Sequence, residues 1–81
     1  MKYSILIIDD EENFREGIAQ YLSQEGYETF EAESVSTARS VLSKNAVDII
    51  LLDVQLGKEY GPSLLSEINR MRPTPKTIII T

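Results

Sequence analysis

Short apolar runs alternate with stretches of helical period along this chain. The runs SILII at 4–8, VDIILLD at 47–53 and KTIIIT at 76–81 are rich in Ile and Leu. Such continuous runs are typical of strands buried on both faces of a parallel sheet. Residues 27–32 alternate apolar and polar positions, which predicts one further short strand.

Between the predicted strands, apolar residues recur with the spacing of an amphipathic helix. Gly26 is placed to end the first helix, Ser34 to cap the second and Pro62 to begin the third. The predicted inner faces are Phe14, Ile18, Tyr21 and Leu22, then Ala38, Val41 and Leu42, then Leu64, Leu65, Ile68 and Met71.

The element order is therefore βαβαβαβ. Strands and helices that alternate at this spacing favour an α/β fold, a doubly wound parallel sheet with right-handed crossovers and helices on both faces. The length of 81 residues limits the chain to one domain at most. The composition, 42% hydrophobic and 26% charged, is ordinary for a soluble globular protein.

Charge and residue usage exclude several classes of function. Without Cys or His, the chain has no disulfide, thiolate or histidine metal site and no Ser-His triad. A net charge of −5 argues against direct contact with nucleic acid. The apolar runs fall far below the roughly 20 residues needed to cross a bilayer, and the N-terminus lacks signal-peptide features. We expect no membrane segment and a cytoplasmic location.

Three acids follow two of the predicted strands: Asp9 and Asp10 end the first, and Asp53 ends the third. Ligands of doubly wound sheets bind beyond the carboxyl ends of the strands, where strand order reverses. If these strands are adjacent, the three carboxylates meet at one edge. A like-charged pair at about 4 Å costs roughly 4 kcal/mol at an effective dielectric of about 20. A hard divalent cation, Mg²⁺ or Mn²⁺, would offset this repulsion.

A carboxylate at such a site can also attack phosphorus and form an aspartyl-phosphate. A metal held by Asp10 would neutralise oxygens of a phosphoryl group arriving at Asp53. The alternative for Asp9 and Asp10 is a helix N-cap, and for Asp53 a solvated loop acid. Two buried-type strands that both end in Asp favour the shared site.

The chain resembles the receiver domains of bacterial response regulators. The resemblance rests on ILIIDDEENFREGIAQYL, EAESVSTARSVL and VDIILLDVQL, then Gly61, then residues 73–81. It implies a flavodoxin-like fold with strand order 2-1-3-4. It also implies a phosphorelay that takes phosphate from a phosphohistidine on a sensor histidine kinase. The start of the third helix is similar to receivers attached to transcriptional regulators.

The resemblance also implies a role for each matching residue. Asp53 corresponds to the phosphoryl acceptor, and Asp10 to the direct Mg²⁺ ligand. Asp9 corresponds to its neighbour, which acts mostly through water. The backbone carbonyl of Gln55 corresponds to a further ligand. Thr81 corresponds to the hydroxyl residue that hydrogen-bonds the phosphoryl group.

Two departures from the family pattern change what we expect. Gly57 stands where the family commonly has Pro, which predicts a freer loop. Residues 1–81 match the N-terminal portion of a single receiver domain, without the family's last strand, last two helices and phosphoryl-contacting Lys. Whether this segment catalyses its own phosphorylation is therefore left open. We expect weak Mg²⁺ binding, slow phosphotransfer, and self-association or a swapped dimer through Ile78–Ile80.

Other interpretations stay open at this point. The segment could be a non-phosphorylatable interaction or structural fragment whose acids are remnants. A flavin- or nucleotide-binding domain needs a Gly-rich phosphate loop after the first strand. This chain has acids there, which repel phosphates. A phosphatase that forms an aspartyl-phosphate needs a general acid at the position of Gln55, and Gln cannot act as one. Arg15, Arg39 and Arg70 are interpreted as solvated helix charges, and Phe14, Tyr21 and Tyr27 as packing residues.

Overall fold

A four-stranded parallel sheet forms the centre of the protein. The computed structural model describes residues 2–80. The strands are β1 (Ser4–Ile8), β2 (Glu28–Ala32), β3 (Ile49–Asp53) and β6 (Lys76–Ile80). They lie in the order β2-β1-β3-β6, and every neighbouring pair is parallel. Because β6 is the fourth long strand along the chain, this order confirms the predicted 2-1-3-4 topology and α/β class.

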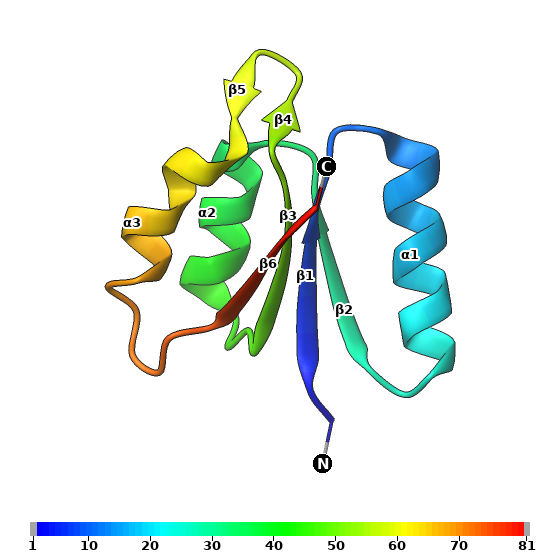
Figure 1. Cartoon of the computed structure of the whole chain (residues 1–81). Coiled ribbons are helices and arrows are strands. Elements are labelled where there is room, and N and C mark those ends of the chain that lie inside the picture. Colours follow the sequence, from blue (N-terminus) through cyan, green and yellow to red (C-terminus); the bar gives the residue numbers. More distant parts are fainter. Residues whose placement is uncertain (1, 81) are drawn as a thin grey trace.

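Helices cover both faces of the sheet. The helical elements are α1 (Glu12–Gln24), α2 (Val35–Lys44), the 3₁₀ turn η1 (Gly61–Leu64) and α3 (Leu65–Ile68). Helix α1 lies on one face, and α2 and α3 lie on the other (Figure 1). The third predicted helix is thus a 3₁₀ turn followed by one short α-helical segment, with Pro62 in the first turn. This arrangement is the doubly wound layering that the alternation of elements predicts.

The ends of α1 and α2 are set by local signals. Ser34 caps α2, its Oγ accepting a hydrogen bond from the Thr37 backbone N–H at 3.1 Å. Gly26 follows the C-cap residue of α1 and has a φ of +97°. The Tyr27 N–H returns to the Leu22 carbonyl at 3.1 Å, which is the Schellman pattern. Glycine adopts this backbone conformation without a Cβ penalty, so the predicted stop is confirmed.

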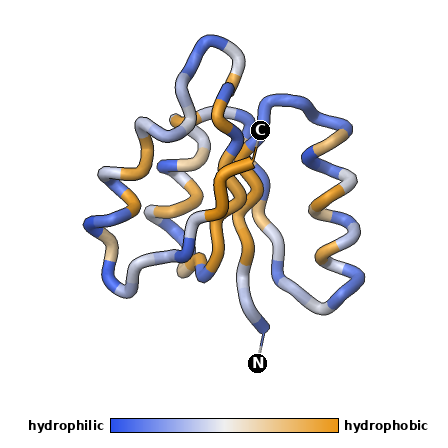
Figure 2. Tube along the Cα trace, viewed as in Figure 1, coloured by the Kyte–Doolittle hydropathy of each residue, from blue (hydrophilic) through white to orange (hydrophobic). Residues whose placement is uncertain are grey.

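The two faces of the central strands bury two separate clusters. The residues of β1 and β3 that pack towards α2 and α3 are fully buried. They are Leu6, Ile8, Ile50 and Leu52. The alternate residues of the same strands point to the α1 side. Apolar residues are therefore concentrated along the central strands, as the orange stretches of Figure 2 show. The members on the α1 side are Ile5, Ile7 and Ala19, with Ile18, Leu22, Tyr27, Ile49 and Leu51 packed against them.

A short antiparallel hairpin follows β3, where the sequence indicated only a loop. Its strands are β4 (Gln55–Leu56) and β5 (Glu59–Tyr60), joined by the two residues 57 and 58. Gly57 has φ +60°, and Lys58 does not have positive φ. This pattern fits a type II′ turn, which requires φ above zero at its first central residue only. The predicted loop is therefore a hairpin, and Gly57 supplies the backbone conformation of its turn, which Pro cannot adopt.

Two of the predicted packing residues of α1 are exposed instead. Phe14 is 52% exposed and Tyr21 is 63% exposed, so the prediction that they pack in the core was wrong. Helix α1 packs mainly over β1 and β2. Phe14 and Tyr21 line an open groove of about 430 Å³ that reaches Leu51 of β3. Ile78 of β6, which pairs in register with Leu51, is 44% exposed.

Candidate functional site

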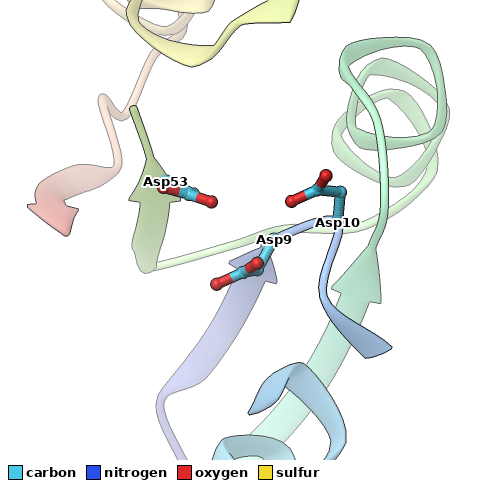
Figure 3. A group of neighbouring side chains, drawn as sticks. All are labelled: Asp9, Asp10 and Asp53. Carbon is cyan, nitrogen blue, oxygen red and sulfur yellow. The ribbon is translucent and has the colours of Figure 1, made fainter. Parts of the chain in front are cut away.

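Three carboxylates meet at the carboxyl ends of β1 and β3. Asp9 and Asp10 follow β1, and Asp53 is the last residue of β3. The register Ile8↔Leu52 brings the ends of the two strands side by side. One oxygen from each of the three carboxylates lies within 4.8 Å of the others, and the side chains face a common space (Figure 3). The prediction that the two strands are adjacent and share an acidic edge is confirmed.

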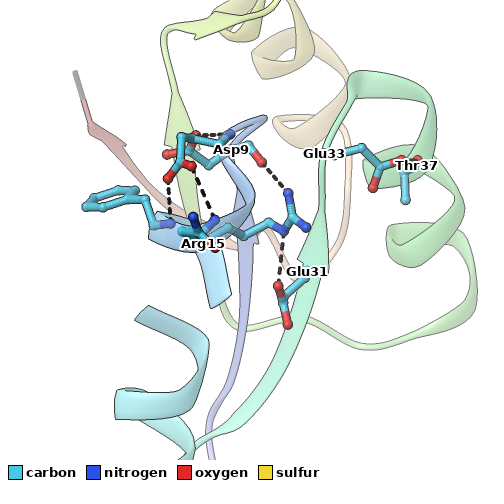
Figure 4. Close-up of polar contacts among 8 residues, drawn as sticks. Asp9, Arg15, Glu31, Glu33 and Thr37 are labelled. Atoms are coloured by element: carbon cyan, nitrogen blue, oxygen red, sulfur yellow. Dashed lines mark hydrogen bonds and ion pairs between the residues drawn. The ribbon is translucent and has the colours of Figure 1, made fainter. Parts of the chain in front are cut away.

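Asp9 is held by hydrogen bonds from three directions. Its backbone N–H donates to the Ala32 carbonyl at 3.0 Å, which continues the pairing of β1 with β2. Its Oδ1 accepts from the Glu11 N–H at 2.9 Å, and its carbonyl accepts from Arg15 Nη1 at 2.9 Å (Figure 4). Asp9 is only 5% exposed. The backbone and side chain of Asp9 are therefore fixed before any ligand arrives.

The electrostatics of Asp9 favour a proton or a cation. Burial raises the pKa of the Asp9 carboxyl above its ordinary value, and the nearby charges of Asp53 and Asp10 raise it further. The hydrogen bond from the Glu11 N–H opposes this rise. The site thus carries like charges that repel one another. A bound cation would relieve the repulsion.

The prediction that Arg15 is a solvated helix charge was wrong. Arg15 is buried, and its Nε donates to Glu31 Oε1 of β2 at 3.0 Å. Together with the bond to the Asp9 carbonyl, this contact places a guanidinium behind the acidic edge. A signal was present in the sequence. Arg15, Ala19 and Leu22 stand at i, i+4 and i+7, so Arg15 belongs to the inner stripe of α1.

Gln55 begins the hairpin two residues after Asp53. Its N–H donates to Asp53 Oδ1 at 3.3 Å, and its side-chain Nε2 donates to the Gly57 carbonyl at 2.7 Å. The Gly61 N–H donates to the Val54 carbonyl at 2.7 Å. Because bonded and non-bonded pairs alternate in an antiparallel ladder, Gln55 and Tyr60 form a non-bonded pair. The ladder therefore leaves the Gln55 carbonyl available.

Gly61 permits the return of the hairpin beside the end of β3. A Cβ at this position would overlap the backbone carbonyl oxygen of Asp53. It would also lie 3.1 Å from the carbonyl carbon of Asp53 and 3.3 Å from Leu52 Cδ1. Only glycine allows the two segments to approach so closely. The residue thus helps to set the backbone that carries Asp53.

Thr81 lies outside the described residues. The last described residue, Ile80, pairs in register with Asp53 at the end of β6. Its carbonyl accepts from the Val54 N–H at 3.1 Å. The fourth long strand therefore ends beside the same acidic edge.

The donor set fits a hard divalent cation. All three side chains offer carboxylate oxygens, the ligands that Mg²⁺ and Mn²⁺ prefer, and the chain has no Cys or His for softer metals. Mg²⁺ is usually bound through one or two carboxylates, with waters and a phosphate completing its octahedron. Asp10 is exposed to solvent and Asp53 partly so, which leaves room for such additional ligands.

The chain thus combines a parallel sheet of order β2-β1-β3-β6 with an acidic cluster beyond its first and third strands. The profile of the response regulator receiver domain matches residues 5–81. The chain belongs to this family. Receiver domains of response regulators are phosphorylated by sensor kinases and bind Mg²⁺ at an acidic site.

Curated relatives include regulators of transcription. The chain is 32% identical over 76 residues to "Response regulator RR06" of Streptococcus pneumoniae, which covers 94% of this chain and 35% of that protein. It is 42% identical over 67 residues to "Phosphate regulon transcriptional regulatory protein PhoB" of Pseudomonas aeruginosa. That match covers 83% of this chain and 29% of the relative. The chain thus spans about a third of the length of these relatives.

Solved receiver structures superpose on nearly the whole chain. A response regulator from Burkholderia pseudomallei with a phosphorylated aspartic acid, calcium ion and citrate gives a TM-score of 0.90 at 26% identity. It covers 96% of this chain and 46% of that one. NtrX from Brucella abortus gives a TM-score of 0.89 at 32% identity, and the match covers 100% of this chain and 18% of that one.

Among residues 2–80, no helix is both long and apolar enough to span a membrane.

Proposed function

We propose that this chain accepts a phosphoryl group on Asp53 from a phosphohistidine of a sensor histidine kinase. The metal ligands in this proposal are Asp9, acting mostly through water, Asp10, Asp53 and the backbone carbonyl of Gln55, with Mg²⁺ or Mn²⁺ bound. The Thr81 hydroxyl contacts the phosphoryl group. The observation that carries the proposal is the approach of the three carboxylates to within 4.8 Å at the strand ends.

The chemistry requires little beyond positioning and charge balance. A carboxylate oxygen of Asp53 forms a bond to phosphorus while the bond from phosphorus to the imidazole nitrogen of the donor breaks. The electron pair of that bond leaves with the imidazole, which takes up a proton. Bound Mg²⁺ supplies positive charge against the carboxylates and the phosphoryl oxygens.

Two features of this chain suit Asp53 to the acceptor role. Asp53 is partly exposed, so a donor can reach it, whereas Asp9 is buried. The Gln55 N–H binds Asp53 Oδ1 at 3.3 Å and so favours one orientation of the carboxylate. The phosphorylated aspartic acid in the Burkholderia relative supports acceptance of phosphate at a related site.

The same proposal extends to the whole protein. We infer that residues 1–81 are the N-terminal portion of a single receiver domain within a longer cytoplasmic regulator, with its output in transcription. The support is the partial coverage of the relatives, which is 35% and 29% for the two curated proteins described above. The Pseudomonas relative is a transcriptional regulatory protein of the phosphate regulon.

Labelling of the purified chain tests the acceptor assignment. The protein is incubated with acetyl phosphate and Mg²⁺, and its intact mass is followed with time. We expect addition of one phosphoryl group to the parent chain and none to Asp53→Asn. The matched control is Glu28→Gln, which removes an exposed acid at the opposite end of the sheet and should label like the parent. Labelling of Asp53→Asn at the parental rate would overturn the assignment.

A second proposal concerns self-association through β6. Ile78 and Ile79 are 44% and 42% exposed, and β6 lies at the edge of the four-stranded sheet. An exposed apolar edge strand can pair with another chain, either directly or by a swap. We propose that the 81-residue chain forms such a homo-oligomer through Ile78–Ile80.

Light scattering across a concentration series tests this second proposal. We expect an oligomer that dissociates in Ile78→Lys, because a charge on an edge strand opposes pairing. Tyr60→Lys is the control, since Tyr60 is 62% exposed on the hairpin and distant in sequence from β6. A monomeric parent at high concentration would contradict the proposal.

A further inference from the structure

The β4–β5 hairpin is attached to the N-terminus of helix α2. Glu59, in β5, accepts a hydrogen bond at its Oε1 from the Val35 backbone N–H at 3.1 Å. Val35 is the first residue of α2 and lies 24 positions earlier in the chain. The local cap Ser34 serves a different donor, the Thr37 N–H. One of the unpaired donors of this helix end is therefore satisfied from the hairpin.

The electrostatics of this contact favour a carboxylate. The N-terminus of a helix carries a partial positive charge, which attracts an acid placed at its first turn. A hydrogen bond from a backbone N–H to an ionised carboxylate is stronger than a bond between neutral groups. Glu59 is thus a more effective attachment for the hairpin than a neutral side chain of similar length.

The same hairpin borders the acidic cluster on its other side. A Cβ at Gly57 would lie 3.6 Å from Asp10 Oδ2, so the turn of the hairpin passes directly beside that carboxylate. Gln55 bridges the hairpin through its Nε2, which donates to the Gly57 carbonyl at 2.7 Å. The hairpin therefore lies between α2 and the acids.

We propose that Glu59 is a positioning residue for the metal site. By attaching the hairpin to α2, it holds the Gln55 carbonyl and the Gly57 turn at a constant position relative to Asp10 and Asp53. Glu59 touches neither the metal nor the phosphoryl group and acts through the backbone of the hairpin. The part of this inference that concerns Mg²⁺ rests on the proposed function, whereas the attachment itself does not.

The chain offers a matched control at the same helix end. Glu33 precedes the cap of α2, and its Oε1 accepts from the Thr37 hydroxyl at 2.8 Å (Figure 4). Its hydrogen bond is local to the helix end. Glu33→Ala therefore removes an acid and a hydrogen bond from the N-terminus of α2 and leaves the Glu59 contact in place. Any general effect of weakening this helix end should appear in both variants.

Hydrogen exchange tests the attachment without metal. In Glu59→Ala the amides of residues 56, 59 and 61 should exchange about tenfold faster, at the low end of what the loss of one hydrogen bond to a charged group produces. Glu59→Gln, which keeps an acceptor oxygen without the charge, should show a smaller increase. Glu33→Ala should leave these amides at the parental rate. Equal exchange in the alanine variants at positions 59 and 33 would overturn the attachment.

Calorimetric titration with Mg²⁺ alone then tests the positioning role. We expect Glu59→Ala to weaken Mg²⁺ binding about tenfold, at the low end of what outer partners of a metal site contribute. Glu33→Ala should bind like the parent. Faster hairpin exchange with unchanged Mg²⁺ affinity would overturn the positioning role. If the parent chain binds no Mg²⁺, the proposed function fails and the positioning role with it, while the exchange result still decides the attachment.

Discussion

Arg15 Nη1 and the backbone carbonyl oxygen of Asp9 are joined by a buried hydrogen bond of 2.9 Å. The same guanidinium donates from Nε to Glu31 of β2 at 3.0 Å. A single side chain of α1 therefore ties the end of β1 to the neighbouring strand. Asp9 belongs to the acidic cluster, so these two hydrogen bonds of Arg15 link the packing of α1 to the position of the Asp9 backbone in the site.

Removal of the guanidinium should destabilise the fold. Arg15→Met keeps most of the apolar stem but leaves the Asp9 carbonyl without its buried donor, a loss of about 1–3 kcal/mol. Urea unfolding measures the change. The exposed Arg70 provides the control, and Arg70→Met should stay within about 0.5 kcal/mol of the parent. Equal stability of the two variants would show that the buried bond contributes nothing.

Asp9→Asn should stabilise the metal-free protein at neutral pH. The pKa of the Asp9 carboxyl is raised in the folded state, mainly by burial, so its charged form costs stability above that pKa. Asn retains an oxygen for the Glu11 N–H. Thermal unfolding with a chelator should show a rise of a few degrees, as about 1 kcal/mol corresponds to roughly 4–8 °C in a domain of this size.

The pH dependence provides the check on this explanation. As pH falls through the raised pKa of folded Asp9, the parent carboxyl takes up a proton and its penalty disappears. The advantage of Asp9→Asn should therefore shrink towards pH 3.8, the ordinary value for the carboxyl. Glu28→Gln should show no such trend. An advantage that grows as pH falls would mean that the sign of the shift is wrong.

Two glycine substitutions should act in opposite directions. Gly61→Ala forces a Cβ against the Asp53 carbonyl and should cost about 1–3 kcal/mol, as in other overpacked sites. Gly17 lies inside α1, and a Cβ added there would meet no atom within 4 Å, so Gly17→Ala should gain about 0.5–1 kcal/mol. Chemical unfolding compares both with the parent. Similar effects of the two substitutions would contradict the close approach at Gly61.

Thr77→Val should stabilise the protein. The Thr77 hydroxyl oxygen is buried and has no hydrogen-bond partner among the described residues. Val has nearly the same shape and lacks the hydroxyl, so unfolding experiments should show a gain of about 1 kcal/mol. Thr37→Val is the contrast, because the Thr37 hydroxyl bonds to Glu33 and accepts from Ser34. That variant should lose stability.

The sequence by itself determined the sheet and the acidic edge. Continuous apolar runs predict strands that are buried on both faces, and helices between them require parallel strands. Because the carboxyl ends of parallel strands meet at one edge, Asp9, Asp10 and Asp53 could be expected together. These inferences depend only on residue type and on the periods of strands and helices, which are local properties of the chain.

Only the tertiary structure decided which side chains lie against the sheet and how the loops attach. Phe14 and Tyr21 carry the helical period, yet they are exposed because α1 packs mainly over β1 and β2. Arg15 is buried because its partners lie on two strands, and Glu59 reaches Val35 from 24 residues away. A hydrogen bond between segments far apart in the chain depends on their relative placement, which residue spacing does not encode.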